Sequence, residues 1–283
     1  MQYSTFAAID IGSYDVILEI FEISKKQGIR SVDKICHRME LGKDTYTLGK
    51  IRPEMEEELC RVLADFVRIM EGYRVDDYRA TASSAISEAS NSLYVLGKIH
   101  QLTGFSVTVL SNSEQRFLSY KALAAMEDNF NKIIEKGTAI LDLDGGSFQI
   151  SLFDKDALVT TQNIRMGSLR IRERLAGIQS ETEHYEEMVE ELIWNEVSSF
   201  KKMYLKDRKI ENIMLIGDVF TDSVYQNIEE KTTKIISREN FNTWYEKIIR
   251  QSPMELAVKL GIPLENASLM YPSAVIYKCL IDM

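Results

Sequence analysis

The chain has 283 residues, a net charge of -9 and 45% hydrophobic residues, which indicates a soluble globular protein long enough for two domains. This charge disfavours non-specific nucleic-acid binding through a broad basic surface. The sequence shows no apolar run near the ~20 residues of a membrane span and no signal segment, so we expect a cytoplasmic protein without a membrane partner.

The first predicted element is a β-hairpin over residues 6–21, with the sequence FAAIDIGSYDVILEIF. An apolar strand ends in Asp10, a turn follows at Gly12 and Ser13, and the return strand alternates in character. Glycine in such a turn lets backbone N–H groups approach an anion closely, and the aspartate can hold a metal ion or water beside it. Gly12 and Ser13 are therefore candidate phosphate-binding residues and Asp10 is a candidate metal ligand, although an ordinary surface hairpin has the same signature.

The following elements alternate between strands and helices. Residues 35–41 are predicted to form a strand, residues 42–49 a polar loop, and residues 54–70 a helix that begins after Pro53. Another strand is predicted at residues 105–110, followed by a helix with Ser111 or Ser113 as its N-cap. Because there is no Pro-rich linker, we expect helical or short connections between the two halves of the chain, near residues 120–138.

A second hairpin is predicted over residues 139–154, with the sequence AILDLDGGSFQISLFD. Its first strand ends at Asp142, which matches Asp10 of the first hairpin. Its turn consists of Asp144, Gly145, Gly146 and Ser147. Two hairpins of the same pattern, each opening one half of the chain, predict an internal duplication with two related lobes.

The remainder of the chain is predicted to be mostly helical, with helices at residues 185–202, 241–250, 254–261 and 270–280 and a strand at residues 213–216. The helix at residues 185–202 is expected to direct Met188, Leu192, Val197 and Phe200 inward. Four arginines follow the second hairpin, at Arg165, Arg170, Arg172 and Arg174. They are interpreted either as a basic patch for a polyanionic ligand or as a solvated helix face beside Glu173.

The paired hairpins resemble the phosphate loops of the actin, sugar kinase and heat-shock ATPase superfamily. Within it, residues 80–91 (ATASSAISEASN), a Met-Gly-Ser segment at 166–168 and a Tyr-Pro-Ser-Ala segment at 271–274 resemble the exopolyphosphatase and guanosine pentaphosphate phosphohydrolase family. The resemblance runs through nearly the whole chain, without the extra C-terminal domain of longer members. It implies an α/β fold of two duplicated actin-like ATPase (ribonuclease H-like) lobes, residues 1–124 and 125–283, with mixed sheets flanked by helices and an interlobe cleft.

The same resemblance implies hydrolysis of a terminal phosphoanhydride in polyphosphate or a guanosine polyphosphate, with Mg2+ as the cofactor. Asp10 and Asp142 would hold the metal ion, and Glu114, Gln115, Asp142 and Gln149 would occupy the catalytic positions. Phosphate contacts are implied for Gly12, Ser13, Ser87, Gly145, Gly146, Ser147 and Arg165. The sequence does not determine the oligomeric state, and a homodimer is one alternative.

Several positions depart from the family pattern. An ungapped overlay places Gln115 at the water-activating acid and Glu114 at the acid before it, and a shift of one residue would make Glu114 the base. Gln149 stands where the family has the closing glutamate of the second hairpin, and Asp144 stands where the family has the first glycine of the turn. Ser87 stands where the family has a phosphate-binding arginine, and a serine cannot make a bidentate, charge-assisted contact.

These changes support two hypotheses of different class, because loss of a general base typically costs ~100 to 10,000-fold in rate. The first is a phosphohydrolase with weak or altered activity, in which Glu114 or Asp144 substitutes as the base. The second is a catalytically inactive relative that acts as a ligand-sensing or protein-binding regulator.

Overall fold

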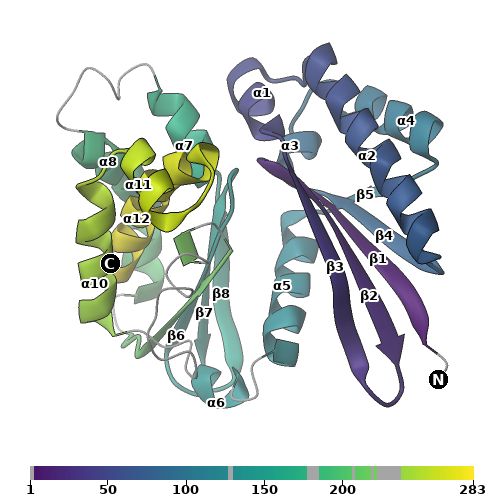
Figure 1. Cartoon of the computed structure of the whole chain (residues 1–283). Coiled ribbons are helices and arrows are strands. Elements are labelled where there is room, and N and C mark those ends of the chain that lie inside the picture. The colour runs from purple at the N-terminus through teal and green to yellow at the C-terminus, as the bar shows by residue number, and fades with distance from the viewer. Residues whose placement is uncertain (1–2, 127–129, 177–184, 206–207, 218–219, 222–236) are drawn as a thin grey trace. The chain divides into compact units, whose positions relative to one another are not determined.

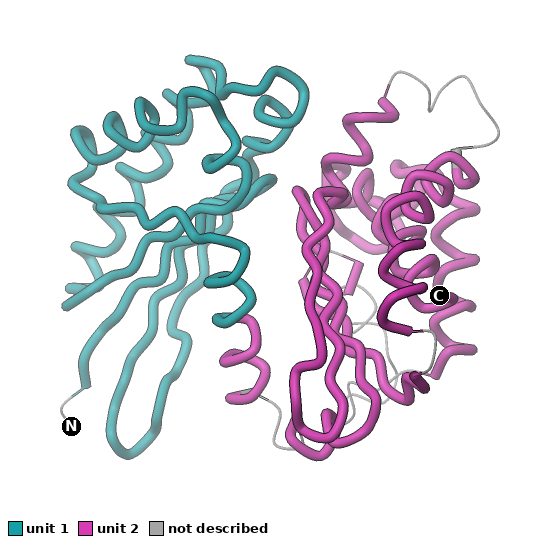
Figure 2. Tube along the Cα trace, turned by 180° about the vertical axis from the view of Figure 1, so that it is seen from behind, with its two compact units in different colours: residues 1–118 teal, residues 119–283 magenta. Residues whose placement is uncertain are grey.

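The computed structural model of the chain describes residues 3–126, 130–176, 185–205, 208–217, 220–221 and 237–283. These residues form two compact units, residues 1–118 and residues 119–283 (Figure 2). The division falls inside helix α5 (Asn112–Met126), so the connection between the units is helical.

The first unit is built on a five-stranded mixed sheet in the order β3-β2-β1-β4-β5 (Figure 1). The strands are β1 (Ser4–Ile11), β2 (Asp15–Ser24), β3 (Gly28–Arg38), β4 (Asp77–Ala82) and β5 (Val107–Val109). Strands β1, β2 and β3 pair antiparallel, whereas β4 pairs parallel with both β1 and β5. The predicted first hairpin is therefore confirmed as β1 and β2. The strand predicted at residues 35–41 is wrong in its bounds, because β3 begins at Gly28 and ends at Arg38.

The helices of the first unit are α1 (Leu41–Leu48), α2 (Pro53–Tyr73), α3 (Ser84–Ser87) and α4 (Ser92–Thr103). The prediction of a polar loop at residues 42–49 is wrong, because this segment forms α1. Asp44 and Thr45 are buried on α1, and the Asp44 carboxylate accepts hydrogen bonds from the backbone N and Nε of Arg52, both at 2.9 Å. Because these polar side chains have hydrogen-bond partners, they can be buried on a helix. The polar composition of the segment does not indicate this arrangement.

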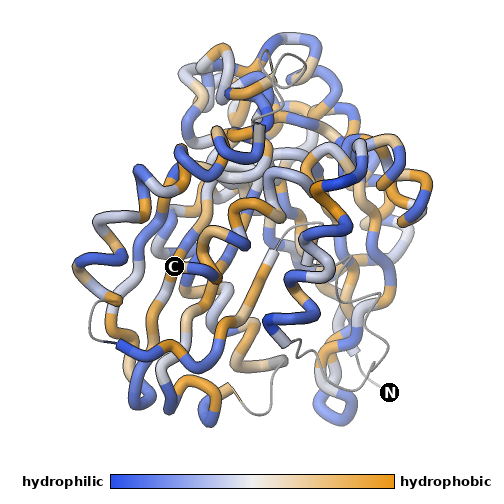
Figure 3. The backbone as a smooth tube through the Cα atoms, turned by 90° about the vertical axis from the view of Figure 1, so that its left-hand side faces the viewer, coloured by the Kyte–Doolittle hydropathy of each residue, from blue (hydrophilic) through white to orange (hydrophobic). Residues whose placement is uncertain are grey.

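The core of the first unit lies between its sheet and the helices α2 and α4. Buried residues alternate along β1 and β2, and they meet the buried stripe of α2; the set includes Ile9, Ile11, Val16, Leu18, Leu59, Leu63 and Phe66. Figure 3 shows hydrophobic and hydrophilic residues alternating along the helices, as expected for elements with one buried face. This packing holds the β1–β2 turn at one edge of a rigid sheet.

The second unit repeats the plan of the first. Its four-stranded sheet has the order β8-β7-β6-β9, formed by β6 (Thr138–Leu143), β7 (Phe148–Asp154), β8 (Ala157–Ile164) and β9 (Asn212–Ile216). Strands β6, β7 and β8 pair antiparallel, and β6 pairs parallel with β9. Because β3-β2-β1-β4 shows the same order and directions, the predicted duplication is confirmed, with mixed sheets flanked by helices in both units.

The helices of the second unit are α6 (Phe130–Ile134), α7 (Ser168–Leu175), α8 (Tyr185–Phe200), the π-helix η1 (Lys201–Leu205), α10 (Arg238–Ile249), α11 (Pro253–Leu260) and α12 (Leu264–Asp282). The buried face of α8 is partly wrong in the prediction: Val189, Ile193, Val197 and Phe200 are buried, while Met188 and Leu192 are half-buried. Helix α12 begins earlier than predicted, so Pro272 lies inside it. Among the described helices, none is long and apolar enough to cross a membrane.

The second half of α5 covers one face of the second sheet. Tyr120 and Leu123 of this helix pack on a cluster formed by Phe130, Ile134, Ile140 and Phe153. Ile140 and Asp142 are two residues apart on β6, so both side chains project from this face. Asp142 therefore lies on the side of the sheet that α5 covers.

Candidate functional site

The turn of the second hairpin is fixed to the start of α7. The backbone N of Ser168 donates to the carbonyl oxygen of Asp144 at 3.1 Å, and the backbone N of Arg170 donates to that of Gly145 at 3.0 Å. The guanidinium Nε of Arg170 donates to the carbonyl oxygen of Gly146 at 2.8 Å. Three consecutive carbonyl groups of the turn are thus anchored by α7.

This anchoring orients the N–H groups of the turn. In a trans peptide the C=O and N–H bonds point in opposite directions, and the described residues contain no cis peptide bond. The N–H groups of Gly145 and Gly146 therefore point away from the backbone of α7, and that of Ser147 points away from the Arg170 guanidinium. Successive N–H groups presented in this way form a concave site for an anion.

Gly167 allows the close approach of α7 to the turn. A Cβ atom at this position would lie 2.3 Å from the carbonyl oxygen of Asp144 and 2.4 Å from the backbone N of Ser147. Both distances are far below van der Waals contact, so a side chain here would push the turn away. The Met-Gly-Ser segment at residues 166–168 is thereby explained as the support of the turn.

Asp142 lies at the end of β6, directly opposite Gln149 of β7. Burial raises the pKa of the Asp142 carboxyl, and a hydrogen bond from Ser119 of α5 opposes that rise. Gln149 is itself buried, with 6% of its surface exposed. The acid and the amide are therefore neighbours across the strand pair.

The end of β9 approaches Asp142 through a glycine. Gly217 has a φ of 74°, and a Cβ there would lie 3.3 Å from Oδ1 of Asp142. The hydroxyl of Tyr277 on α12 donates to the carbonyl oxygen of Ile216 at 3.0 Å, which holds this strand end in place. Phe220, which follows this strand end, is fully buried against Phe241 and Tyr277.

The turn of the first hairpin is docked on the start of α1. The backbone N of Gly42 donates to the carbonyl oxygen of Ser13 at 2.7 Å, and Met39 N donates to that of Tyr14 at 3.1 Å. The Ser13 hydroxyl lies 2.7 Å from the Tyr46 hydroxyl, which in turn lies 2.8 Å from the hydroxyl of Ser84 on α3. Ser13 is buried, so its hydroxyl has a structural role: it joins the turn to α1 and α3 through Tyr46 and Ser84.

Asp10 ends β1 beside a second carboxylate. Burial and the neighbouring Asp15 carboxylate raise the pKa of Asp10 to about 6, and a 3.3 Å hydrogen bond from the Thr81 hydroxyl opposes the rise. Protein surrounds the carboxyl group closely, although the residue keeps contact with solvent. An ion can therefore reach Asp10 from solution.

The carboxylates of Asp10 and Asp142 are each a suitable ligand for a magnesium ion that keeps most of its water. Mg2+ is usually held by one or two carboxylates, several waters and substrate phosphates. Asp10 and Asp142 each carry a carboxyl group whose charged form burial disfavours, and a nearby divalent cation would stabilise that form. Within the described ranges no group of three or more metal-ligating side chains occurs, which fits a hydrated ion better than a protein cage.

Glu114 is part of the N-terminal cap of α5. Its carboxylate accepts hydrogen bonds from the backbone N and the hydroxyl of Ser111, at 2.9 and 2.7 Å, and its own N–H donates to that hydroxyl at 3.3 Å. These bonds lower the pKa of Glu114, which makes it a weaker base. Gln115, which is half-buried, precedes Ser119 by four residues on the same helix, so the two side chains share a face.

The remaining predicted phosphate ligands are solvent-exposed. Ser87 is the last residue of α3, and Arg165 directly follows β8. Arg172 is bonded to Glu173 at 2.6 Å and to the Ser268 hydroxyl at 2.8 Å, so it links α7 to α12. Arg170 and Arg172 thus have different partners. The sequence grouped Arg170 with the basic patch but did not indicate its role as an anchor of the turn at residues 144–147.

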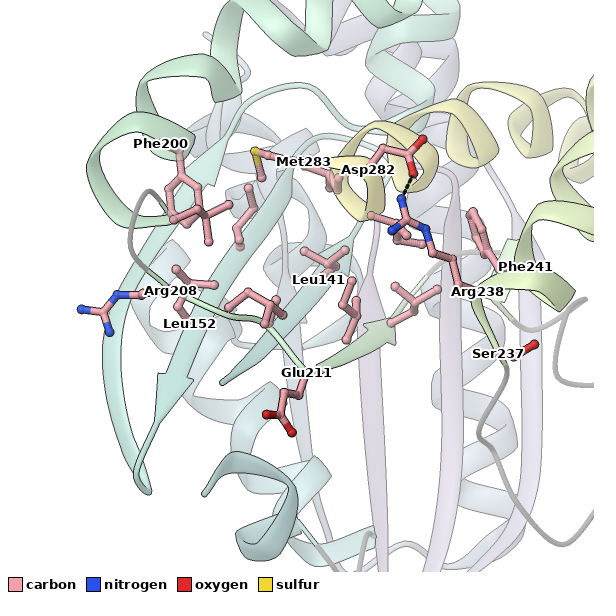
Figure 4. A pocket seen from close by; sticks show the side chains of 18 residues that line it. Leu141, Leu152, Phe200, Arg208, Glu211, Ser237, Arg238, Phe241, Asp282 and Met283 are labelled. Atoms are coloured by element: carbon pink, nitrogen blue, oxygen red, sulfur yellow. Dashed lines mark hydrogen bonds and ion pairs between the residues drawn. The ribbon is translucent and has the colours of Figure 1, made fainter. Parts of the chain in front are cut away.

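The second unit also contains an apolar pocket of about 530 Å3. Figure 4 shows Leu141 and Leu152 directed into it between Phe200 and Phe241, while Arg208 and Glu211 point outward at its rim. Leu141 and Asp142 are adjacent on β6 and project from opposite faces of the sheet. The pocket is therefore separate from the Asp142 side of the sheet.

Comparisons with known proteins identify the family of the chain. The sequence model described as the Ppx/GppA phosphatase family matches residues 19–283. The bifunctional 3-dehydroquinate synthase/phosphatase of Fusobacterium nucleatum is 22% identical over 238 residues, which cover 80% of this chain and 34% of that protein. Exopolyphosphatase 1 of Mycobacterium leprae is 25% identical over 144 residues, which cover 50% of this chain and 41% of that protein. The chain thus spans well under half the length of these curated relatives.

Solved structures show the same fold. An exopolyphosphatase from Cytophaga hutchinsonii superposes with a TM-score of 0.85 at 18% identity, covering 99% of this chain and 90% of that one. The Ppx/GppA family member of Aquifex aeolicus superposes with a TM-score of 0.75 at 19% identity, with the same coverage. The expected actin-like ATPase fold is thereby confirmed.

Proposed function

The chain belongs to the Ppx/GppA phosphatase family, and from this premise we propose that its second hairpin turn binds the terminal phosphates of a polyphosphate or a guanosine polyphosphate. The observation that carries the proposal is the anchoring of the Asp144, Gly145 and Gly146 carbonyl groups by α7. In this proposal the N–H groups that follow these carbonyl groups donate to the phosphate, as successive N–H groups do in other phosphate-binding turns.

The chemistry proposed for this site is hydrolysis of the terminal phosphoanhydride, with Asp142 and Asp10 as the residues that would hold Mg2+ through water. The ion, when bound, would neutralise phosphate charge. The Gly145 and Gly146 N–H groups would fix the phosphate, and the Gln115 amide would orient a water molecule but could not take its proton. We therefore expect hydrolysis to be slow.

Of the two carboxylates that could substitute as the base, Asp144 is better supported. Glu114 is engaged by the Ser111 backbone and hydroxyl at the start of α5, which lowers its pKa and holds its side chain. Asp144 belongs to the phosphate-binding turn itself. Its carboxylate is the acid nearest in sequence to the bound phosphate in this proposal.

A second candidate function is that of a phosphate-sensing or protein-binding regulator without turnover. One observation favours it: the amide of Gln149 is buried directly opposite Asp142. The ungapped overlay on the family pattern also favours it, because that overlay places Gln115 at the water-activating acid. Both changes remove a carboxylate while leaving the turn and its anchors intact. Such a chain would keep ligand binding and lose chemistry.

One experiment separates these functions. Release of inorganic phosphate from polyphosphate and guanosine pentaphosphate is measured with Mg2+ for the natural chain, Asp142→Ala and the double variant Gln115→Glu/Gln149→Glu, together with the thermal shift caused by each ligand. Turnover by the natural chain that Asp142→Ala abolishes supports the slow enzyme. A thermal shift without turnover, with activity appearing in the double variant, supports the regulator, and the lack of both shift and turnover in every variant rejects the phosphate site.

A further inference from the structure

Asp15 and Arg38 face each other at the end of the first sheet. They are direct partners in the antiparallel β2–β3 pair, and Nη1 of Arg38 lies 3.5 Å from Oδ2 of Asp15. The same Asp15 oxygen accepts the Cys36 thiol at 3.7 Å. The Arg38 guanidinium also lies over the Tyr14 ring, 5.8 Å from its centroid. The only cation within hydrogen-bonding range of this carboxylate, among the described residues, is therefore Arg38.

The Asp15 side chain folds back over the turn of the first hairpin. A Cβ atom at Gly12 would lie 3.0 Å from Oδ1 of Asp15, and Gly12 N already donates to the Asp15 carbonyl oxygen at 2.9 Å. The space that glycine leaves open above this turn is thus taken by a carboxylate of the same chain. In the second hairpin the corresponding turn is held by α7, which bonds the carbonyl groups of Asp144, Gly145 and Gly146.

This placement is not explained by stability. The Asp15 side chain has only 14% of its surface exposed, and the Asp10 carboxylate lies near enough to raise the pKa of its own carboxyl through repulsion. Burial likewise raises the pKa of Asp15, and Arg38 only partly compensates. Perturbed acids of this kind cluster at functional sites, which agrees with a role for Asp15 beyond the packing of the turn.

We propose that the Asp15 carboxylate is a built-in competing anion, which covers the turn of the first hairpin and holds Arg38 until a phosphate group displaces it. The inference rests on the proposed function, because the displacing ligand belongs to the same class of phosphate compounds. A phosphate offers three oxygens to a guanidinium, whereas Asp15 makes one long contact, so a phosphate is the stronger partner once it is present. Asp15 then sets the phosphate concentration at which the first hairpin becomes engaged.

The test is the affinity of the full chain for sodium tripolyphosphate with Mg2+, measured by isothermal titration calorimetry. Asp15→Ser and Asp15→Asn should bind roughly tenfold more tightly than the natural chain, the equivalent of one charge-assisted contact that no longer has to be broken. Glu19→Gln is the matched control: Glu19 lies on the same strand, and the variant removes the same charge. It should leave the affinity unchanged.

A second variant shows whether Arg38 carries the gain. Arg38→Ala introduced into Asp15→Ser should cancel the tenfold increase. Arg38→Ala alone should bind more weakly than the natural chain, because the phosphate that displaces Asp15 no longer finds the guanidinium. Thermal melting without ligand confirms that each variant folds, and Asp15→Asn, which conserves size, guards against loss of folding in Asp15→Ser.

Three results would overturn the proposal: unchanged affinity in both Asp15 variants, an equal gain in Glu19→Gln, or a gain that survives Arg38→Ala. The first of these with measurable binding by the natural chain leaves the proposed phosphate function standing. No binding by the natural chain or by any variant would reject both.

Discussion

The two hairpin turns share a strand plan but use their backbone groups in opposite ways. In the second, α7 bonds the carbonyl groups of Asp144, Gly145 and Gly146, so the N–H groups of Gly145 and Gly146 point away from α7. In the first, the Gly12 N–H is bonded within the turn and Asp15 covers it. The comparison teaches that a duplicated topology does not duplicate a binding site, because the contacts behind each turn decide what it can bind.

The largest expected effect comes from breaking the support of the second turn. Gly167→Ala places a Cβ atom 2.3 Å from the Asp144 carbonyl oxygen, so the turn must move, and we expect tripolyphosphate binding to fall at least ~100-fold. Gly137→Ala is the control, because its Cβ would lie 2.1 Å from the carbonyl oxygen of Lys209, beside the opposite end of β6. Both variants should lose stability, and equal loss of binding in both would contradict a specific role of the turn.

Removal of a single anchor should have an intermediate effect. Arg170→Ala deletes the 2.8 Å hydrogen bond to the Gly146 carbonyl oxygen, and binding measured by calorimetry should weaken about tenfold. Arg172→Ala, on the same helix, removes bonds to Glu173 and Ser268 and should lower the melting temperature without changing affinity. If the two variants exchanged these effects, the anchoring account would be wrong.

The first turn should respond mainly in stability. Tyr46→Phe removes the hydroxyl that bridges Ser13 and Ser84 and leaves the buried Ser13 hydroxyl without it, which should lower the free energy of unfolding by ~1–2 kcal/mol. Tyr73→Phe, whose exposed hydroxyl bonds Asp33, should cost much less. Urea unfolding compares the two, and equal costs would argue against a structural bridge.

The smallest effect is a pH dependence at Asp10. A carboxyl group whose pKa rises from 3.8 to about 6 on folding stabilises the chain below pH 3.8, and this contribution is lost as the pH rises through about 6. Asp10→Asn should therefore be more stable than the natural chain at pH 8, and the difference should shrink toward pH 4. Asp65→Asn, at an exposed site on α2, is the control. A difference that stays constant with pH would contradict the raised pKa.

Sequence reasoning identified the features that depend on local patterns. The two hairpins, their matching aspartates and the duplication follow from strand alternation interrupted by glycine turns, and the fold follows from them. Helix α1 was missed because Asp44 and Thr45, polar residues typical of loops, are buried and paired there. The inward face of α8 was assigned partly wrongly because apolar residues occupy more than one of its sides.

The contacts behind the turns could not be predicted because they join distant segments. Arg170 is 24 residues from Gly146, and nothing in its spacing distinguishes it from Arg172 or Arg174. The Asp15–Arg38 pair depends on the register of β2 and β3. Hydrophobic alternation shows which side chains share a face, but it does not show which residue of β3 lies opposite Asp15. Glu114 was predicted as a base only from a one-residue shift of the family overlay. Its spacing from Ser111 matches a capping box, which is a signal that the sequence does contain.

The most direct test of the central claim is the response of individual backbone amides to ligand. In 1H–15N spectra of the labelled chain, titration with tripolyphosphate and Mg2+ should shift the amide signals of Gly145 and Gly146 downfield along one saturating curve, because their N–H groups donate to the bound phosphate. The signal of Gly12, whose N–H is bonded within its own turn, should move less. Saturable binding that leaves Gly145 and Gly146 unshifted would contradict the account.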